Sequence, residues 1–152
     1  MILEGSCHCQ NLAFTLDWPG EPAEIVARVC DCSFCSRHGC AWTSEPSARL
    51  RLRIEDASLL SLYAFATESA EFSICTRCGV VPLVLSRIEG GVYAVVNVNT
   101  FTNLEAGRIR RLPLRLGDEA LETRLARRKL RWIADVEEER LRPAAPFRLG
   151  SD

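Results

Sequence analysis

Up to about Thr102, short apolar runs alternate with turn residues, and no helical periodicity is present. The clearest signal is at residues 49–54, where arginine and an aliphatic residue alternate, since a period of two places one face of a strand on the core. The pattern predicts about eight strands, at residues 12–16, 25–29, 41–43, 49–54, 59–63, 70–74, 80–85 and 92–98. Pro82 lacks the N–H that a strand ladder needs, which indicates an edge or an interruption in its strand. We therefore expect a mainly β body.

The C-terminal part of the chain has a different periodicity. Beyond residue 118, apolar side chains recur at helical spacing with charged residues between them: Leu121, Leu125, Trp132, Ile133 and Val136. Asp118 is suited to be an N-cap, and Pro143 and Pro146 would end the helix. The pattern predicts one amphipathic helix over residues 118–141, packed on the body through Trp132, and a loose end over residues 143–152. We therefore divide the chain into a β domain, residues 1–117, and a helix with its tail, residues 118–152.

The composition is typical of a soluble globular protein, with 47% hydrophobic and 26% charged residues in a chain of 152. The longest segment without a formal charge, residues 90–104, is too short and too polar to span a bilayer. The net charge of −1 is unevenly distributed: residues 1–104 carry 7 basic and 11 acidic side chains, whereas residues 105–152 carry 12 and 9. The acidic body disfavours nucleic-acid binding, and the mixed charges of the tail are typical of a solvated helix face.

Eight cysteines in three clusters add a chemical prediction to this fold. The clusters are Cys7 with Cys9, then Cys30, Cys32 and Cys35 followed by Cys40, and finally Cys75 with Cys78. Cysteines one or two residues apart cannot easily bridge to each other, but they can direct two thiolates at one metal ion. A secreted disulfide framework is the alternative, but residues 1–16 contain Glu4 and lack the basic region of a signal peptide. We therefore expect metal-bound thiolates in a reducing cytoplasm.

The first and third clusters together offer the ligand set of a closed, tetrahedral zinc site. The four sulfur ligands would be those of Cys7, Cys9, Cys75 and Cys78. Gly79 follows the last cysteine, where glycine tolerates the positive φ that comes after such a turn. A metal ion here would tie the first strand to a late hairpin, so that metal binding contributes to folding. His8 is expected to be a surface side chain, because four thiolates already complete the tetrahedron.

The middle cluster offers three thiolates on one short loop, namely Cys30, Cys32 and Cys35. Three protein ligands leave a fourth position for water or substrate, which is the arrangement of catalytic zinc sites. Zinc there could polarise a carbonyl group or hold an incoming thiol as its thiolate. Alternatively, Cys40 closes the site and makes it purely structural. A redox-active pair is disfavoured, because no βαβ pattern surrounds the cluster.

These clusters resemble the signature of the glutathione-dependent formaldehyde-activating enzyme family. The segments that carry the resemblance are residues 5–9, 30–39, 75–79 and 95–101. The family shares a domain with the centromere protein V group and has an Mss4-like fold. Over residues 3–104, the resemblance implies a β-tent of antiparallel sheets held at a zinc ion.

The resemblance also implies two zinc ions per chain. It assigns the first ion, a structural one, to Cys7, Cys9, Cys75 and Cys78, and a catalytic ion to Cys30, Cys32 and Cys35. Two positions depart from the family pattern: Gln10 stands where the family usually has glycine, which alters a turn, and Cys40 stands where the pattern has no cysteine.

The leading hypothesis is a zinc-dependent carbon–sulfur lyase that acts on an adduct of glutathione, or a similar thiol, with a small aldehyde, such as S-hydroxymethylglutathione. Glutathione carries two carboxylates, so basic side chains should line its pocket, and Arg37 and Arg77 are candidates because they lie near the clusters. His38 could shuttle a proton or be a simple loop histidine. The rival hypothesis is a non-enzymatic zinc module that binds a protein partner, which a closed second zinc site would favour.

Overall fold

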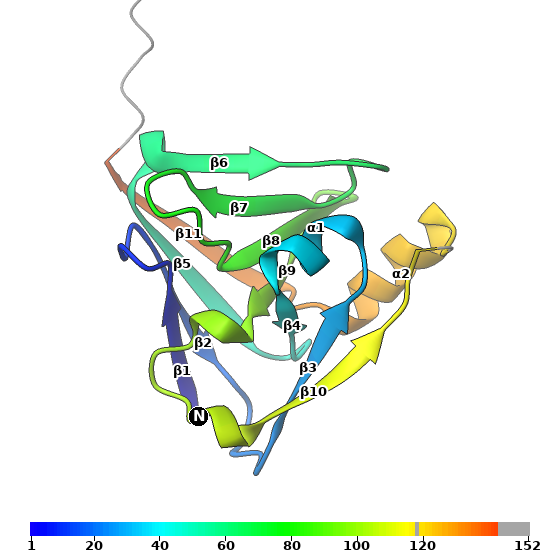
Figure 1. Cartoon of the computed structure of the whole chain (residues 1–152), viewed down its shortest axis with the longest axis horizontal. Helices are drawn as coiled ribbons and strands as arrows, with labels where there is room; N and C mark the ends of the chain where they lie inside the picture. Colours follow the sequence, from blue (N-terminus) through cyan, green and yellow to red (C-terminus); the bar gives the residue numbers. More distant parts are fainter. Residues whose placement is uncertain (118, 143–152) are drawn as a thin grey trace, which may run out of the picture.

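The computed structural model describes residues 1–117 and 119–142, which form two β-sheets with a hydrophobic core between them (Figure 1). The smaller sheet has the strand order β1-β2-β5-β11 and the larger one β10-β3-β4-β9-β8-β7-β6. The strands of the smaller sheet are β1 (Ile2–Ser6), β2 (Leu12–Asp17), β5 (Arg49–Asp56) and β11 (Asp135–Arg142). Those of the larger sheet are β3 (Ile25–Cys30), β4 (Ala41–Thr43), β6 (Leu60–Tyr63), β7 (Glu71–Cys75), β8 (Leu83–Ile88), β9 (Gly91–Asn97) and β10 (Ile109–Leu114).

The mainly β prediction is confirmed, and the eight predicted strands correspond to β2 through β9. The structure adds β1, β10 and β11. Most neighbouring strands are antiparallel as expected, but β10 pairs with β3 and β11 pairs with β5 in parallel, so both sheets are mixed. Pro82 precedes β8, which lies between β9 and β7 in the interior of its sheet, so the expectation of an edge strand is wrong. Proline is tolerated there because the ladder begins only at Leu83.

The long C-terminal helix is only partly present. The helix α2 covers Leu121–Arg131, and β11 follows where the helical pattern was extended to residue 141. Intrinsic propensity is overridden here because the backbone of β11 completes the smaller sheet beside β5. Ion pairs between exposed side chains, Arg49 with Asp135 at 2.8 Å and Arg51 with Glu137 at 3.1 Å, accompany that pairing. The N-cap predicted at Asp118 and the loose end at residues 143–152 lie outside the described residues.

A short helix interrupts the segment that was expected to be a loop around the middle cysteines. This helix, α1, covers Ser33–His38, and its C-cap Gly39 adopts the left-handed conformation at φ +62°. The remaining helical turns are of the 3-10 type: η1 (Ala57–Leu59), η2 (Val98–Thr100) and η3 (Ala106–Arg108). None of the helices in residues 1–117 and 119–142 has the length and apolar character that crossing a membrane would require.

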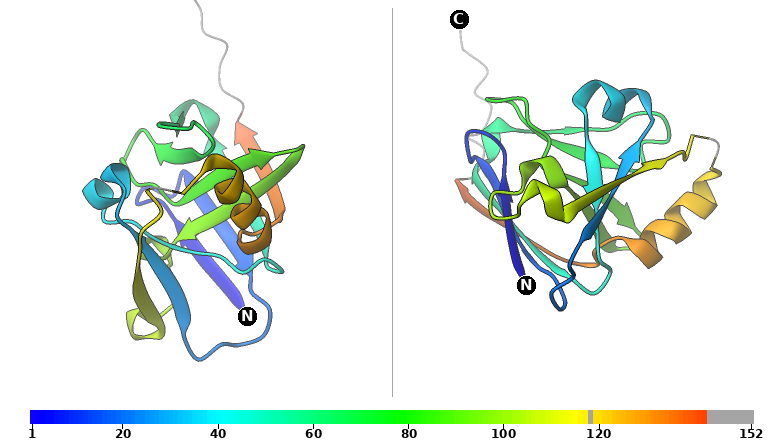
Figure 2. Two further views of the ribbon diagram at one scale, coloured as in Figure 1. Left: turned by 90° about the vertical axis from the view of Figure 1, so that its right-hand side faces the viewer. Right: turned by 60° about the horizontal axis from the view of Figure 1, so that its bottom comes forward.

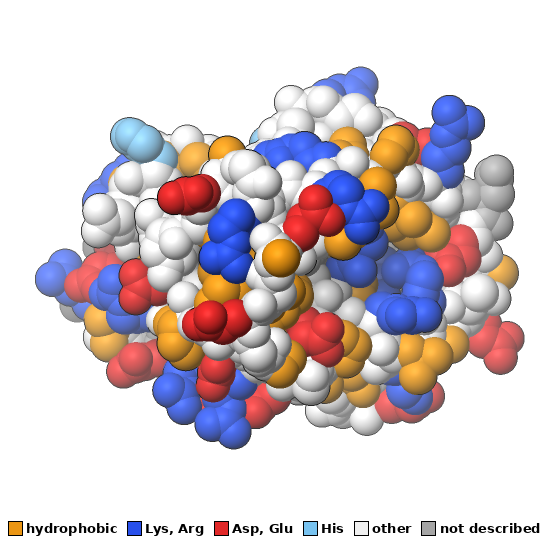
Figure 3. Space-filling view, turned by 90° about the horizontal axis from the view of Figure 1, so that it is seen from below, with side chains coloured by type: hydrophobic (Ala, Val, Ile, Leu, Met, Phe, Trp, Pro, Cys, Tyr) orange, Lys and Arg blue, Asp and Glu red, His pale blue; other side chains and the backbone are white. Residues whose placement is uncertain are grey.

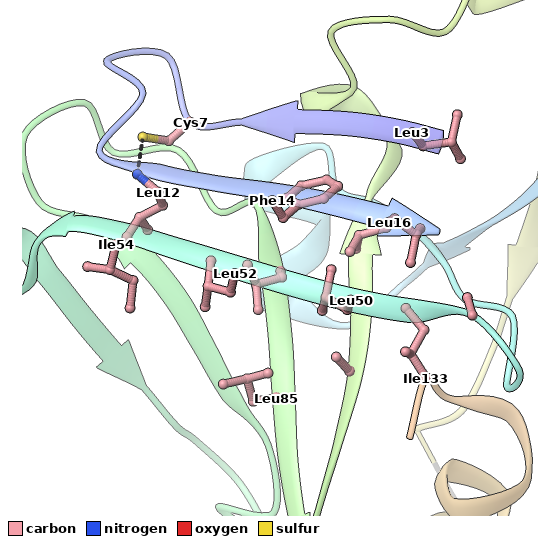
Figure 4. Packing of buried hydrophobic residues seen from close by; sticks show 14 of the residues in the cluster. Leu3, Cys7, Leu12, Phe14, Leu16, Leu50, Leu52, Ile54, Leu85 and Ile133 are labelled. Atoms are coloured by element: carbon pink, nitrogen blue, oxygen red, sulfur yellow. Dashed lines mark hydrogen bonds between the residues drawn. The ribbon is translucent and has the colours of Figure 1, made fainter. Parts of the chain in front are cut away.

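The two central strands of the larger sheet, β8 and β9, are buried on both faces. Leu83, Leu85 and Val96 belong to the main core between the sheets. Figure 4 shows Leu85 there, near aliphatic side chains of β2 and β5. Val84 and Val95 alternate with them and join a second cluster on the opposite face. Cys35 of α1 and Trp132, which directly follows α2, are part of the cluster on that second face, and α2 packs against β8 (Figure 2). Trp132 joins the second cluster and Ile133 the first, which confirms the expected docking through Trp132.

Close packing at Gly5 fixes the register of β1 against β2. Gly5 lies directly opposite Phe14, and a Cβ atom added to Gly5 would stand 2.2 Å from the Phe14 ring. We predict that Gly5→Ala lowers the free energy of unfolding by about 1 to 3 kcal/mol, because the buried ring must move. Denaturant unfolding measures this, with Gly107→Ala as the control, since nothing lies within 4 Å of a Cβ at Gly107. Equal stability of the two variants would contradict the prediction.

Two candidate metal centres and an adjoining pocket

The first and third cysteine clusters come together in space. The sulfur atoms of Cys7, Cys9, Cys75 and Cys78 all lie within 4.8 Å of one another. The distance from the Cys9 sulfur is 3.8 Å to that of Cys7 and 3.4 Å to that of Cys75. A tetrahedral ion with metal–sulfur bonds of about 2.3 Å places its sulfur ligands about 3.8 Å apart. The four thiols therefore fit a single metal ion.

Two tight turns place these four sulfurs. After β1, the Cys7 N–H donates to the Leu12 carbonyl, and the Leu12 N–H donates to the Cys7 sulfur at 3.3 Å (Figure 4). After β7, the Gly79 N–H donates to the Cys75 carbonyl at 2.7 Å, and Gly79 has the predicted positive φ of +75°. Gln10 has a φ of +63° in the first turn, a conformation that glycine adopts more readily, so the departure from the family pattern is confined to this turn.

The electrostatics of this cluster favour a cation. Burial raises the pKa of the Cys7 thiol to about 12. Burial acts in the same direction on Cys78, but hydrogen bonds from the backbone N–H groups of Cys9 and Val80 outweigh it and lower the pKa of Cys78 to about 6. A buried group of four thiols cannot ionise fully by itself, whereas a divalent ion compensates the thiolate charges and displaces the protons.

The second cluster stands at the end of β3 and the start of α1. The sulfur atoms of Cys30, Cys32 and Cys35 lie within 4.8 Å of one another. Cys32 is the N-cap of α1, and its sulfur accepts the Cys35 N–H at 3.4 Å. The Cys35 sulfur accepts a hydrogen bond from the indole Nε1 of Trp42 at 3.3 Å. Hydrogen bonding from Cys35 lowers the pKa of Cys30 to about 6, against the effect of burial.

Cys40 does not belong to this group of three sulfurs. Its side chain is 2% exposed, and its sulfur accepts a hydrogen bond from Nδ2 of Asn97 at 3.7 Å. Burial, followed by the charges of Cys32 and Cys30, raises the pKa of Cys40 to about 11. The arrangement thus contains three sulfurs that could hold a metal ion and a fourth thiol that packs into the adjoining hydrophobic cluster.

A pocket of about 250 Å³ opens beside the three-cysteine group. All three of its cysteines line the pocket. Aromatic walls come from Trp42, Phe65, Phe72 and Trp132. Basic side chains come from β3 and α2: Arg28, Arg124, Arg127 and Arg128. The lining also contains one carboxylate, that of Asp31, so the pocket is apolar on several sides and carries a net positive charge on another.

The basic residues proposed from sequence are not those of the pocket. Arg37 does not line it and donates to the Ser33 carbonyl within α1, and Arg77 does not line it either. The ring of His38 stacks on Phe34 with centroids 4.4 Å apart, and His38 is likewise absent from the lining. The sequence does contain a signal for part of the pocket lining. Arg124, Arg128 and Trp132 follow one another at intervals of four residues, which places them on one face of a helix.

The fold and the paired cysteine centres define a mainly β protein with two thiol clusters suited to metal ions. The sequence model of the family described as glutathione-dependent formaldehyde-activating enzyme matches residues 2–110. The chain belongs to this family. A crystal structure of a Rhodobacter sphaeroides protein is similar, with 28% sequence identity and a TM-score of 0.55 over 72% of this chain and 99% of that one.

The packing of Cys40 generates a prediction about metal content. We expect Cys40→Ser to retain the same number of metal ions as the parent protein and to lose at most about 1 to 2 kcal/mol of stability, because it removes a packed sulfur and no ligand. Elemental analysis of the reduced, metal-replete protein and denaturant unfolding provide the measurements. Loss of one ion from the variant would show instead that Cys40 is a fourth ligand.

Proposed function

We propose that the protein is a zinc-dependent carbon–sulfur lyase acting on a thiol–aldehyde adduct such as S-hydroxymethylglutathione. Membership of the family supports glutathione-dependent formaldehyde activation as the general activity. The observation that carries the proposal for this chain is the pocket, which joins the group Cys30, Cys32 and Cys35 to a cationic wall. The three sulfurs suit a metal ion, and the arginines suit the carboxylates of glutathione.

In this proposal the two clusters hold zinc ions with different roles. Cys7, Cys9, Cys75 and Cys78 would hold a structural ion, because four thiolates complete its coordination. Cys30, Cys32 and Cys35 would hold the catalytic ion and leave one position toward the pocket. When bound there, zinc supplies stabilisation of a substrate thiolate near neutral pH.

The protein's own residues position the reactants. The indole N–H of Trp42 holds the Cys35 sulfur at 3.3 Å, which fixes one ligand beside the pocket. The rings of Phe72 and Trp132, both less than one tenth exposed, exclude water from the same space. In the synthetic direction, the sulfur electron pair forms the C–S bond to the aldehyde carbon, and the carbonyl π pair moves to oxygen. That oxygen takes up the proton that the thiol releases, and the lyase direction reverses each step.

A zinc module that only binds a protein partner is the second candidate. It would be favoured by a closed second site and a surface without a cleft. The three-sulfur group and the pocket beside it favour the enzyme instead.

The activity can be tested with a change in the three-cysteine group. We predict that Cys32→Ser abolishes the acceleration of exchange between glutathione and formaldehyde, because two thiolates hold the ion poorly. Exchange NMR is the measurement, since the uncatalysed reaction is fast and an endpoint would mislead. The fold and the ion at the four-cysteine site should persist. An exchange rate in the parent protein no greater than in Cys32→Ser would contradict the proposed activity.

The two centres should also differ in their effect on folding. We expect Cys78→Ser to lose the ion at its site and to unfold or lose several kcal/mol of stability, because that ion joins the turn after β1 to the turn after β7. Circular dichroism with elemental analysis compares it with Cys32→Ser, which removes one thiol from the other centre. Equal destabilisation of both variants would contradict the division into a structural and a catalytic ion.

A further inference from the structure

The cationic wall of the pocket comes largely from a segment outside the residues that the family model matches. The match ends at residue 110, and α2 covers Leu121–Arg131. Three arginines of α2 line the pocket beside the cysteines. Figure 3 shows Lys and Arg side chains at several places on this face, and one group of them lies toward the right, the side on which α2 lies in Figure 1. Family membership assigns no role to these side chains.

The pocket arginines divide into two that form an ion pair with a carboxylate and two that do not. Arg124 and Arg127 form ion pairs with the Glu119 carboxylate, at 3.7 and 2.9 Å. Arg28 and Arg128 form no ion pair with a carboxylate of residues 1–117 or 119–142. Arg28 donates to the hydroxyl group of Ser44, a neutral acceptor. The single Glu119 carboxylate balances only one of the Arg124 and Arg127 charges, so the arginines of the pocket carry an excess of positive charge.

Arg128 is the more unusual of the two because it is only 7% exposed. Its NH1 group donates to the Ser69 carbonyl at 2.7 Å and to the Ser86 hydroxyl at 3.1 Å, and both acceptors are neutral. Its Nε is buried without a hydrogen-bond partner. The guanidinium also lies over the Trp132 ring, 4.9 Å from the centroid, which offsets part of the cost of burial.

A buried cation without a carboxylate partner is costly unless it binds an anion in the working protein. Burial, together with the charges of Arg124 and Arg127, lowers the pKa of Arg128 to about 10, so the group still carries its charge near neutral pH. The hydrogen bonds to serine hold the guanidinium in one orientation. The Arg128 guanidinium is therefore already oriented before a ligand binds, as a side chain that recognises an anion would be.

We propose that Arg128, assisted by Arg28, binds a carboxylate of the thiol substrate, so that the C-terminal helix α2 sets a preference for acidic thiols. This inference rests on the proposed function for the identity of the ligand. Charge-assisted hydrogen bonds to a carboxylate are among the strongest in proteins. The adjoining Trp132 ring would contact the apolar part of the same ligand.

The test compares glutathione with glutathione diethyl ester, which keeps the thiol and loses both carboxylate charges. Trp42 and Trp132 line the pocket, so quenching of tryptophan fluorescence reports binding to the zinc-loaded protein. We expect the parent protein to bind glutathione about tenfold or more tightly than the ester. In Arg128→Met, affinity for glutathione should fall toward that for the ester, with Arg28 still present, and affinity for the ester should be unchanged. Lys129→Met, which removes an exposed charge of the same helix outside the pocket, should keep the preference.

A purely structural role for Arg128 predicts a different result, namely equal weakening of both ligands. That result would overturn the proposal. Arg128→Lys keeps the charge and should retain part of the preference, and it replaces the methionine variant if the latter does not fold. A preference unchanged in Arg128→Lys and Arg128→Met alike would also overturn it.

The exchange assay separates this proposal from the proposed function. Carboxylate-dependent binding that disappears in Arg128→Met, without accelerated exchange in the parent, would refute the lyase and support the arginine site. Accelerated exchange that is equal for glutathione and its ester would support the lyase and refute the arginine site. Absence of glutathione binding by the zinc-loaded parent would refute both.

Discussion

The fold depends on the burial of hydrophobic side chains on both faces of β8 and β9. Alternate side chains of these strands enter two hydrophobic clusters, with Leu83 and Val96 on one side and Val84 and Val95 on the other. The smaller sheet packs on the first face. On the second face, α1, α2 and the aromatic side chains leave a pocket of about 250 Å³. The candidate site is therefore the part of the second face that packing does not fill, and the three cysteines stand at its edge.

The two cysteine groups have different relations to this architecture. Cys7 and Cys75 are completely buried at the margin of the main core, where turns after β1 and β7 meet. Cys30 and Cys32 are partly exposed and face the pocket. A closed ligand set in the core suits stability, and an incomplete one beside a pocket suits chemistry. The different surroundings of the two groups are the basis of the two roles that we propose for them.

Much of the fold and the grouping of the cysteines could be predicted from the sequence, because period-two alternation and close cysteine spacing are local signals. The C-terminal segment could not. Residues 135–142 are rich in glutamate and arginine, which favour a helix in isolation, and only pairing with β5 makes them a strand. The pocket arginines could not be predicted for a related reason. Charged side chains on an amphipathic helix are usually solvated, and the sequence does not show that α2 packs against β8 with this charged face toward the pocket. Arg128 is recognisable only once its burial against Ser69 and Ser86 is known.

The central claim is that the group Cys30, Cys32 and Cys35 holds a metal ion with a position open to a thiol. X-ray absorption at the zinc edge, on Cys78→Ser if it remains folded or otherwise on the fully loaded parent, measures the sulfur ligands directly. For the ion at this group the account predicts three sulfurs and one oxygen or nitrogen ligand, with a fourth sulfur gained when glutathione is added; in the parent, where the two sites are averaged, this is a rise from about 3.5 to about 4 sulfurs per ion. A four-sulfur site before addition, with no change afterward, would contradict it.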